Sequence, residues 1–187
     1  MSDKKEVFIS VDVETSGPIP GEYSLLTIGA VNVDDISQAF ECTLKPLSRN
    51  ADSKAMEVTG LSLEELDRTG LTPQEAMVRF SDWLVGVIGV NRSAVFVGLN
   101  APFDWSFINY YFHRFTGGNP FGFAALDIKA YYMGSTGCSW SDTRSSRMAA
   151  ILCPATRGTH VALDDALYQA ELFRLIRQRL AARNVRT

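Results

Sequence analysis

An apolar strand that ends in two carboxylates constrains this chain of 187 residues more than any other part of its sequence. Residues 7–12 alternate as β-strand residues do, and Asp12 and Glu14 close the segment F-I-S-V-D-V-E-T. Because successive side chains of a strand point to opposite faces, these two carboxylates project to the same side. Two anions so placed repel each other unless a cation lies between them, and their oxygens suit Mg²⁺ or Mn²⁺. The segment therefore predicts a strand that carries part of a metal site.

The order of the predicted strands indicates a mixed α/β sheet with helices on its faces. Strands at 7–12, 25–33 and 38–44 follow one another closely, which favours an antiparallel meander. Two later apolar runs, at 95–99 and 124–127, alternate with helical segments, and the first of them is typical of a buried parallel strand.

The helical segments are recognised by capping patterns and by apolar periodicity. They are expected to begin at Ser62-x-x-Glu65, at Thr72-Pro73, at Asn100 and Pro102, near residue 128 and near residue 161. The Gly, Ser and Arg content of residues 134–159 predicts an irregular or weakly helical segment, a functional or mobile loop.

The composition fits a single domain over residues 1–187, with 46% hydrophobic and 21% charged residues. No apolar run approaches the ~20 residues that span a membrane. The start of the chain, M-S-D-K-K, leads into a short strand and does not resemble a signal peptide. Cys42, Cys138 and Cys153 are an odd number without metal-ligand spacing, which predicts reduced thiols in a cytoplasmic protein.

The net charge of −3 argues against a general nucleic-acid coat protein, but the charges are unevenly distributed. Residues 1–143 hold 10 Lys/Arg and 18 Asp/Glu, whereas residues 144–187 hold 8 Arg and 3 Asp/Glu. The arginines beyond Arg174 are equally compatible with a solvated helix. Arg144, Arg147 and Arg157 precede the segment T-H-V-A-L-D-D-A, so they are the better candidates for phosphate contacts.

Asp104 follows the apolar run at 95–99 and falls in the first turn of the helix that Asn100 and Pro102 open. The helix dipole favours a negative group at this position, so a purely structural aspartate is an alternative to a metal ligand. Its claim to a functional role depends on the other carboxylates.

His160 and Asp165 are five residues apart, which rotates a helix about 140° beyond one full turn. The pair therefore cannot share one helical face, and the geometry works if His160 precedes the helix and Asp165 lies one turn inside. Asp165 aligns with the apolar positions Leu172 and Ile176, so we expect it to face inward and the neighbouring Asp164 to be solvated.

The chain has only two histidines, and they differ in their surroundings. His113 lies in an aromatic helix and is expected to be a structural or surface residue. His160 follows an arginine-containing loop and has the better claim to proton transfer near neutral pH.

The segments Asp12-x-Glu14, Asn100-Ala-Pro-Phe-Asp104 and His160-x4-Asp165 occur in the order and approximate spacing of the three motifs of DEDDh exonucleases. The chain thus resembles the DnaQ-like branch of the ribonuclease-H-like superfamily, from about residue 7 to residue 176. The resemblance implies a mixed five-stranded sheet, with three antiparallel strands and then parallel ones, flanked by helices.

The resemblance also implies an activity: 3′→5′ removal of nucleoside 5′-monophosphates from the ends of single-stranded DNA or RNA. Two Mg²⁺ or Mn²⁺ ions would be held by Asp12, Glu14, Asp104 and Asp165, and His160 would be the general base. Several relatives are dimers, so a homodimer is possible.

Further residues match the family's substrate contacts more loosely. The turn Thr15-Ser16-Gly17 matches the one that contacts the terminal nucleotide, and residues 56–61, beginning with Met56, are similar to a pocket wall. The other substrate-binding candidates are Asn100, Phe103, Arg144 and Arg147.

Two alternatives come from other classes of protein. A haloacid-dehalogenase-type phosphatase begins with a similar strand and D-x-D-x-T, and Asp164-Asp165 could mimic its late acidic pair, but it leaves Asp104 and His160 without roles. A non-catalytic nucleic-acid-binding module could share the fold, although the presence of all five motif residues argues against a decayed active site.

Overall fold

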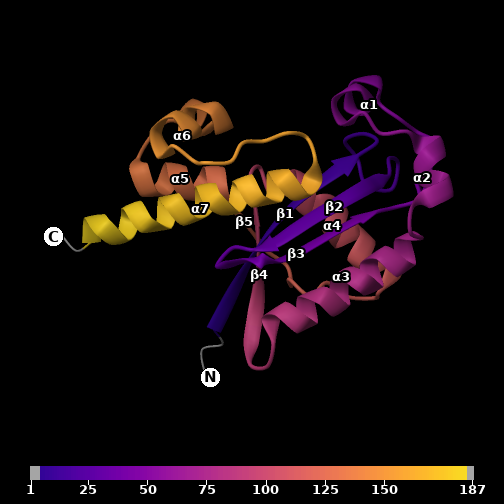
Figure 1. The fold of residues 1–187 in the computed structure, drawn as a ribbon, viewed down its shortest axis with the longest axis horizontal. Helices are drawn as coiled ribbons and strands as arrows, with labels where there is room; N and C mark the ends of the chain where they lie inside the picture. The colour runs from indigo at the N-terminus through magenta and orange to yellow at the C-terminus, as the bar shows by residue number, and fades with distance from the viewer. Residues whose placement is uncertain (1–4, 185–187) are drawn as a thin grey trace.

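One mixed sheet organises the part of the chain that the computed structural model describes, residues 5–184, with side chains through residue 182. Its strands are β1 (Lys5–Thr15), β2 (Leu25–Asn32), β3 (Asp35–Thr43), β4 (Arg92–Gly98) and β5 (Ala125–Asp127). They lie in the order β3-β2-β1-β4-β5 (Figure 1). β1 to β3 pair antiparallel, whereas β4 lies parallel to β1 and β5 lies parallel to β4. The predicted fold class is confirmed.

β1 is longer than its alternating pattern predicts, because it continues through Asp12 and Glu14 to Thr15. The two acidic residues keep their places in the antiparallel ladder, where Asp12 pairs with Gly29 and Glu14 with Thr27. The parallel ladder with β4 stops earlier, at Ser10. The end of β1 is therefore paired on one side only, and its other edge is open to contacts from other segments.

The helices are α1 (Ser53–Thr59), α2 (Leu63–Thr69), α3 (Pro73–Ile88), α4 (Pro102–Phe115), α5 (Ile128–Thr136), α6 (Ser145–Leu152) and α7 (Ala162–Asn184), with a 3₁₀ turn η1 (Trp140–Thr143). The predicted capping box of α3 is present, since Thr72 Oγ1 accepts from the N–H of Glu75 and the Glu75 carboxylate accepts from the N–H of Thr72. Ser62 caps α2 as predicted. In the part of the chain that the structure describes, no helix is long and apolar enough to cross a membrane.

The expectation of an irregular or weakly helical loop at residues 134–159 is wrong for much of that segment. It contains the end of α5, η1 and the eight residues of α6. Met148 and Leu152 are four residues apart, so they lie on one face of α6 and are buried against residues of α7. This apolar pair stabilises the helix despite the polar composition around it. The irregular parts of the segment are residues 137–139, residue 144 and residues 153–159.

The two faces of the sheet are covered by different helices. The odd-numbered β1 residues from Val7 to Val13 belong to a core cluster with residues of α3 and α4. Residues of β2, β4, α5, α6 and α7 form a second cluster on the opposite face, which α7 crosses (Figure 1). Because side chains alternate along β1, Asp12 and Glu14 point to the face that α7 covers.

Candidate metal centre and active site

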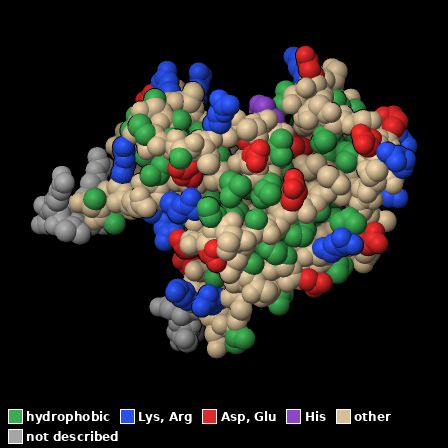
Figure 2. Space-filling view, in the orientation of Figure 1, with side chains coloured by type: hydrophobic (Ala, Val, Ile, Leu, Met, Phe, Trp, Pro, Cys, Tyr) green, Lys and Arg blue, Asp and Glu red, His purple; other side chains and the backbone are tan. Residues whose placement is uncertain are grey.

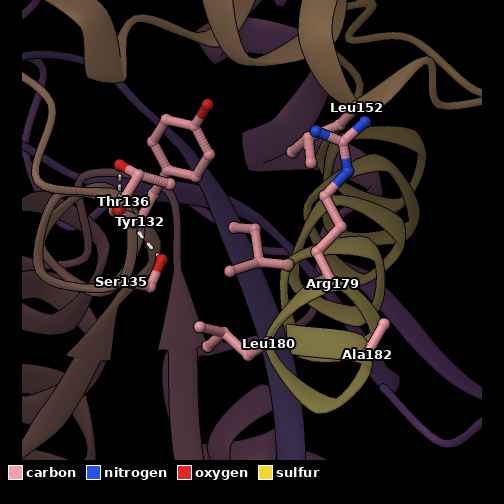
Figure 3. Close-up of a pocket in the computed structure, with 8 residues that line it drawn as sticks. Tyr132, Ser135, Thr136, Leu152, Arg179, Leu180 and Ala182 are labelled. Carbon is pink, nitrogen blue, oxygen red and sulfur yellow. Dashed lines mark hydrogen bonds between the residues drawn. The ribbon is translucent and has the colours of Figure 1, made fainter. Parts of the chain in front are cut away.

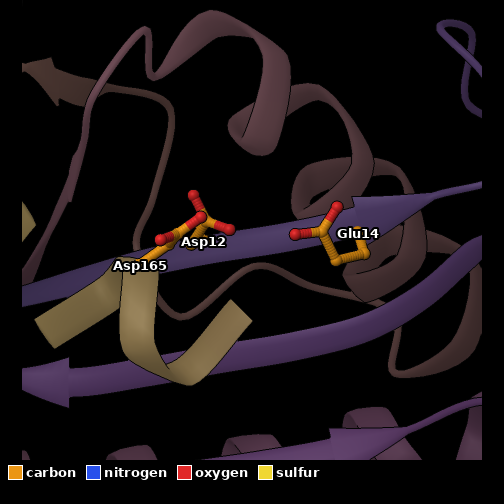
Figure 4. A group of neighbouring side chains, drawn as sticks. All are labelled: Asp12, Glu14 and Asp165. Carbon is orange, nitrogen blue, oxygen red and sulfur yellow. The ribbon is translucent and has the colours of Figure 1, made fainter. Parts of the chain in front are cut away.

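Three carboxylates from two distant segments meet at the end of β1. Asp12 and Glu14 come from that strand and Asp165 from the first turns of α7, and each offers an oxygen within 4.8 Å of the others (Figure 4). All three side chains are half-buried and point toward one another. A set of carboxylate oxygens at this separation is the donor set that hard divalent cations prefer.

Asp104 lies beside this cluster but is held differently. It is 5% exposed in the first turn of α4, and its Oδ1 accepts the backbone N–H of Val13 over 3.1 Å. That N–H is available because the ladder between β1 and β4 has already ended at Ser10. Asp104 therefore lies at the open edge of β1, close enough to Asp12 for their charges to interact. It is not one of the three carboxylates that meet within 4.8 Å in the described part of the chain.

Burial and mutual repulsion make the cluster hold protons in the absence of a cation. Burial raises the pKa of Asp12 well above its ordinary value, and the charges of Asp104, Glu14 and Asp165 raise it further. Burial, followed by the charge of Asp165, raises the pKa of Glu14 to about 7, and burial is the main cause that raises the pKa of Asp104 to about 8. A divalent cation could replace these protons, because it neutralises the same charges.

Gly29 allows α7 to approach the sheet closely at this site. It pairs with Asp12 in the ladder, so a side chain there would point to the face that α7 covers. A Cβ on Gly29 would lie 2.2 Å from the carbonyl carbon of Ala162 and 2.3 Å from the nitrogen of Leu163. The sequence analysis missed this residue, although a glycine inside a strand is a signal of close backbone approach.

His160 precedes α7 with a left-handed backbone, φ 61°, and an exposed side chain. Its backbone N–H donates to Asp165 Oδ2 over 3.1 Å, and the N–H of Thr159 donates to Asp165 Oδ1 over 2.7 Å. Asp164 is exposed, and its carboxylate accepts only the Thr159 hydroxyl among the hydrogen bonds of the described residues. The predicted geometry, with His160 outside the helix and Asp165 facing in, is confirmed.

The rest of the segment before His160 is held by a second carboxylate of α7. Glu171 Oε1 accepts the N–H of Ala155 over 2.7 Å, and Glu171 Oε2 accepts the N–H of Thr156 over 2.9 Å. Two carboxylates of α7 thus fix the segment 155–160: Glu171 holds its beginning and Asp165 holds its end. This function of Glu171 was not predicted from the sequence.

Gln169 is another residue that the sequence analysis missed. It is 3% exposed on α7, and its Nε2 donates to Asp12 Oδ1 while its Oε1 accepts the N–H of Leu99 over 2.8 Å. A buried amide with both ends engaged connects α7 to β1 and to the end of β4.

The predicted substrate turn after β1 has its side chains engaged within the protein. The Thr15 hydroxyl donates to the carbonyl of Gly17 over 2.9 Å, and the Ser16 hydroxyl donates to the carbonyl of Asn50 over 2.8 Å. Gly17 packs so closely on Tyr23 that a Cβ would lie 2.2 Å from that ring. These contacts fix the shape of the turn, and a role in substrate binding stays a prediction.

The remaining substrate candidates near the cluster are Met56, Asn100 and Phe103. Met56 is half-buried on α1, which the N–H of Asp52 ties to the carbonyl of Ser16 over 2.7 Å. Phe103 is half-buried on α4, and Asn100 is exposed with a left-handed backbone, φ 68°. α1 and α4 both contact β1, and these helices together with the link before α4 present both apolar and polar groups.

The basic C-terminal quarter divides into two groups of arginines. Arg174 and Arg179 donate to backbone carbonyls of Val33 and Ile151, and Arg177 pairs with Asp34 over 2.9 Å, so these three side chains are engaged within the protein. Arg186 and the side chain of Arg183 lie outside the described residues.

The other arginines lie on and next to α6. Arg144, Arg147 and Arg157 are exposed, and Arg147 forms an ion pair with Asp142. Figure 2 shows Lys and Arg side chains gathered over the α6 side of the molecule, next to a hollow that separates this side from the α1 side.

An apolar groove of about 270 Å³ lies away from the carboxylates (Figure 3). It is lined by Tyr132, Ser135 and Thr136 of α5, Leu152 of α6, and Ile176, Arg179, Leu180 and Ala182 of α7. Ile176 is eleven residues beyond Asp165, about 16 Å along the helix. The groove is therefore distinct from the carboxylate cluster.

Comparisons with known proteins agree with this geometry. A family model described as an exonuclease matches residues 9–173. The protein Cap18 of Escherichia coli, described as a 3′-5′ DNA exonuclease, is 58% identical over 176 residues, which cover 94% of this chain and 94% of that protein.

Two solved structures share the fold at low sequence identity. The nuclease domain of 3′hExo, a DEDDh family member bound to rAMP, has 15% identity and a TM-score of 0.74, with 95% of both chains covered. Exonuclease I of Escherichia coli, in complex with a dT13 oligonucleotide, has 17% identity and a TM-score of 0.72, over 97% of this chain and 43% of that one. At such identities the likeness establishes the fold alone.

The alternatives considered from the sequence do not agree with these findings. A haloacid-dehalogenase-type phosphatase is excluded, because the exonuclease model matches most of the chain and all three motifs lie within its range. A non-catalytic module is excluded as well, since the family is one of enzymes. The fold is the one seen in a DEDDh nuclease domain, and the chain belongs to the exonuclease family.

Proposed function

We propose that this single-domain enzyme is a 3′→5′ exonuclease of single-stranded DNA that releases nucleoside 5′-monophosphates. The meeting of Asp12, Glu14 and Asp165 within 4.8 Å, with Asp104 beside them, is the observation that carries the proposal. The choice of DNA over RNA is supported by the description of the 58% identical relative as a DNA exonuclease.

Asp12, Glu14, Asp104 and Asp165 would hold two Mg²⁺ or Mn²⁺ ions. Divalent metal use is general in DEDDh exonucleases, and the donor set here fits it because all four groups are carboxylates. When bound, such ions lower the pKa of the attacking water and neutralise charge on the scissile phosphate. The carboxylates of the chain would supply the ligands, and a bound cation would relieve the like-charge repulsion that helps to raise the pKa values of Asp12 and Glu14.

His160 would accept a proton from the attacking water at an imidazole nitrogen. Its side chain is exposed, and its backbone is fixed to Asp165, a carboxylate of the cluster. A histidine held at this place can exchange protons with solvent after each turnover, and general bases of this kind contribute about 10²–10⁴-fold to the rate.

The terminal nucleotide would lie between α1 and α4, against Met56 and Phe103. Asn100 and the turn Thr15-Ser16-Gly17 would line the same space, the latter through backbone groups since its hydroxyls are engaged. The exposed Arg144 and Arg147 would contact phosphates of the strand on its 5′ side.

The specificity for DNA is tested with 5′-labelled single-stranded DNA and RNA of one sequence, each with Mg²⁺, with Mn²⁺ and with EDTA. We expect DNA to be shortened faster than RNA, with nucleoside 5′-monophosphates as products in mass spectrometry. Asp164→Asn serves as the matched control for Asp165→Asn, since the two residues are adjacent and only Asp165 lies in the cluster. Release of nucleoside 3′-monophosphates, or faster digestion of RNA, would contradict the proposal.

A cytoplasmic location and a homodimer are the remaining predictions from the sequence. The first is supported by the three cysteines, which are free in the described part of the chain. The second is tested by light scattering after gel filtration, where a dimer has twice the monomer mass of 20.6 kDa.

A further inference from the structure

Gln169 lies between the carboxylate of Asp12 and the first residue after β4. Its Nε2 donates to Asp12 Oδ1, and its Oε1 accepts the N–H of Leu99 over 2.8 Å. The orientation of this amide is determined by Leu99, whose backbone N–H can only donate, so Oε1 must face Leu99 and Nε2 faces Asp12. With 3% of its surface exposed, Gln169 exchanges little of this bonding with water.

The position of Gln169 couples all three motif segments. It stands one helical turn after Asp165 on α7, so one helix provides both a carboxylate of the cluster and the donor that holds Asp12. Leu99 begins the short link from β4 to α4, and Asp104 lies in the first turn of α4. A single side chain therefore ties the strand of Asp12 to the helix of Asp165 and to the link that leads to Asp104.

We propose that Gln169 is a positioning residue of the metal centre. By engaging Oδ1 of Asp12 it fixes the rotation of that carboxylate and leaves the second oxygen for the cation. Groups that hydrogen-bond a metal ligand typically change metal affinity or activity 10–100-fold when they are removed. The proposal rests on the proposed function for the use of a divalent ion at this site.

The test is Mn²⁺ binding to Gln169→Met, measured without nucleic acid by titration calorimetry or by the paramagnetic resonance signal of free Mn²⁺. Methionine keeps the length and volume of glutamine but removes both hydrogen bonds. We expect Mn²⁺ affinity to fall about 10-fold or more, and the Mn²⁺ concentration for half-maximal nuclease activity to rise with it. The KM for DNA at saturating Mn²⁺ should stay unchanged. Gln178→Met, an exposed position on the same helix, is the matched control.

A second variant covers the case in which Gln169→Met does not fold, as judged by circular dichroism in EDTA. Gln169→Asn keeps an amide but is one methylene shorter, so it cannot reach both Asp12 and Leu99, and we expect a similar loss of Mn²⁺ affinity. Wild-type affinity in either folded variant overturns the proposal, and so does failure of both to fold, because the residue then serves folding. If the wild-type chain binds Mn²⁺ and Gln169→Met binds it weakly, but neither cleaves DNA, the proposed function fails and the positioning role stands.

Discussion

The backbone N–H of His160 donates to Oδ2 of Asp165 over 3.1 Å. One carboxylate thus lies in the metal cluster and fixes the backbone of the proposed general base. The two functions that the sequence assigned to separate residues, holding the cation and moving the proton, are joined by this hydrogen bond. Together with the hydrogen bond from the N–H of Thr159 to the same carboxylate, it holds the left-handed backbone of His160, φ 61°, just before α7.

His160→Ala should lose catalysis while keeping the metal. The side chain is exposed and is not part of the three-carboxylate group of the described residues, so its removal leaves the cation ligands in place. We expect kcat to fall about 10²–10⁴-fold with Mn²⁺ affinity within about twofold of wild type. His113→Ala, the other exposed histidine, is the control and should retain activity. A His160→Ala enzyme of near wild-type kcat would show that another group accepts the proton.

Glu171→Ala should loosen the segment that carries His160. The carboxylate accepts the N–H groups of Ala155 and Thr156, so its loss leaves residues 155–158 without their anchor. We expect kcat to fall about 10-fold, about 1.4 kcal/mol of transition-state stabilisation, with Mn²⁺ affinity unchanged. Trypsin should cleave after Arg157 faster than in wild type, and Gln178→Ala should alter neither property. Unchanged proteolysis at Arg157 would refute the anchoring role.

Gly29→Ala should separate α7 from the sheet at the metal centre. The new Cβ would lie 2.2 Å from backbone atoms of Ala162, which cannot move without the helix. We expect the free energy of unfolding to fall by about 3 kcal/mol, at the upper end for overpacking, together with a loss of Mn²⁺ affinity.

Gly86→Ala provides the matched control for this substitution. Apart from its chain neighbours and the backbone of its own helix, no described atom comes within 4 Å of a Cβ at position 86, which is exposed on α3. Alanine also favours helix over glycine by about 1 kcal/mol. Gly86→Ala should therefore be neutral or stabilising in denaturant unfolding. Equal effects of the two substitutions would contradict the close approach at Gly29.

In EDTA the protein should become less stable as the pH rises. Burial raises the pKa of Glu14 from 4.5 to about 7 and that of Asp104 from 3.8 to about 8. At a pH between the ordinary and the raised pKa of each group, the folded state binds more protons than the unfolded state. The free energy of unfolding therefore decreases as the pH rises from about 4 to about 8. We expect Tm to fall from pH 4.5 to pH 8 in EDTA, and Mg²⁺ to restore it at pH 8 because the cation replaces the protons. A Tm that rises over this range in EDTA would contradict the raised pKa values.

The orientation of the motif residues could be predicted from the sequence, because each orientation depends on the geometry of a single strand or helix. Strand alternation places Asp12 and Glu14 on one face, and helix phase selects Asp165 over Asp164, as the structure has them. The fold class followed from the order of strands and helices. The length of β1 was underestimated because polar residues end an alternating pattern even when the backbone continues to pair.

The residues that were missed depend on contacts between distant segments. Gln169 reaches Asp12 across 157 positions of the sequence and Leu99 across 70, and Gly29 meets α7 from the second strand. Neither has a local pattern that indicates its partner. Residues 145–152 were expected to be weakly helical at most, because so short a segment has little helical stability of its own. The helix α6 is stabilised by packing of Met148 and Leu152 against α7, which the local sequence does not indicate.

The central claim is that the carboxylates at the end of β1 and the start of α7 form a metal centre that removes nucleotides from 3′ ends. The most direct measurement is a time course on 5′-labelled single-stranded DNA with Mg²⁺, using wild type and Asp12→Asn. The account predicts a ladder that shortens from the 3′ end in wild type and that is abolished both by EDTA and by Asp12→Asn. Shortening that persists in EDTA or in Asp12→Asn would contradict it. DNA that stays intact both with Mg²⁺ and with Mn²⁺ would contradict it as well.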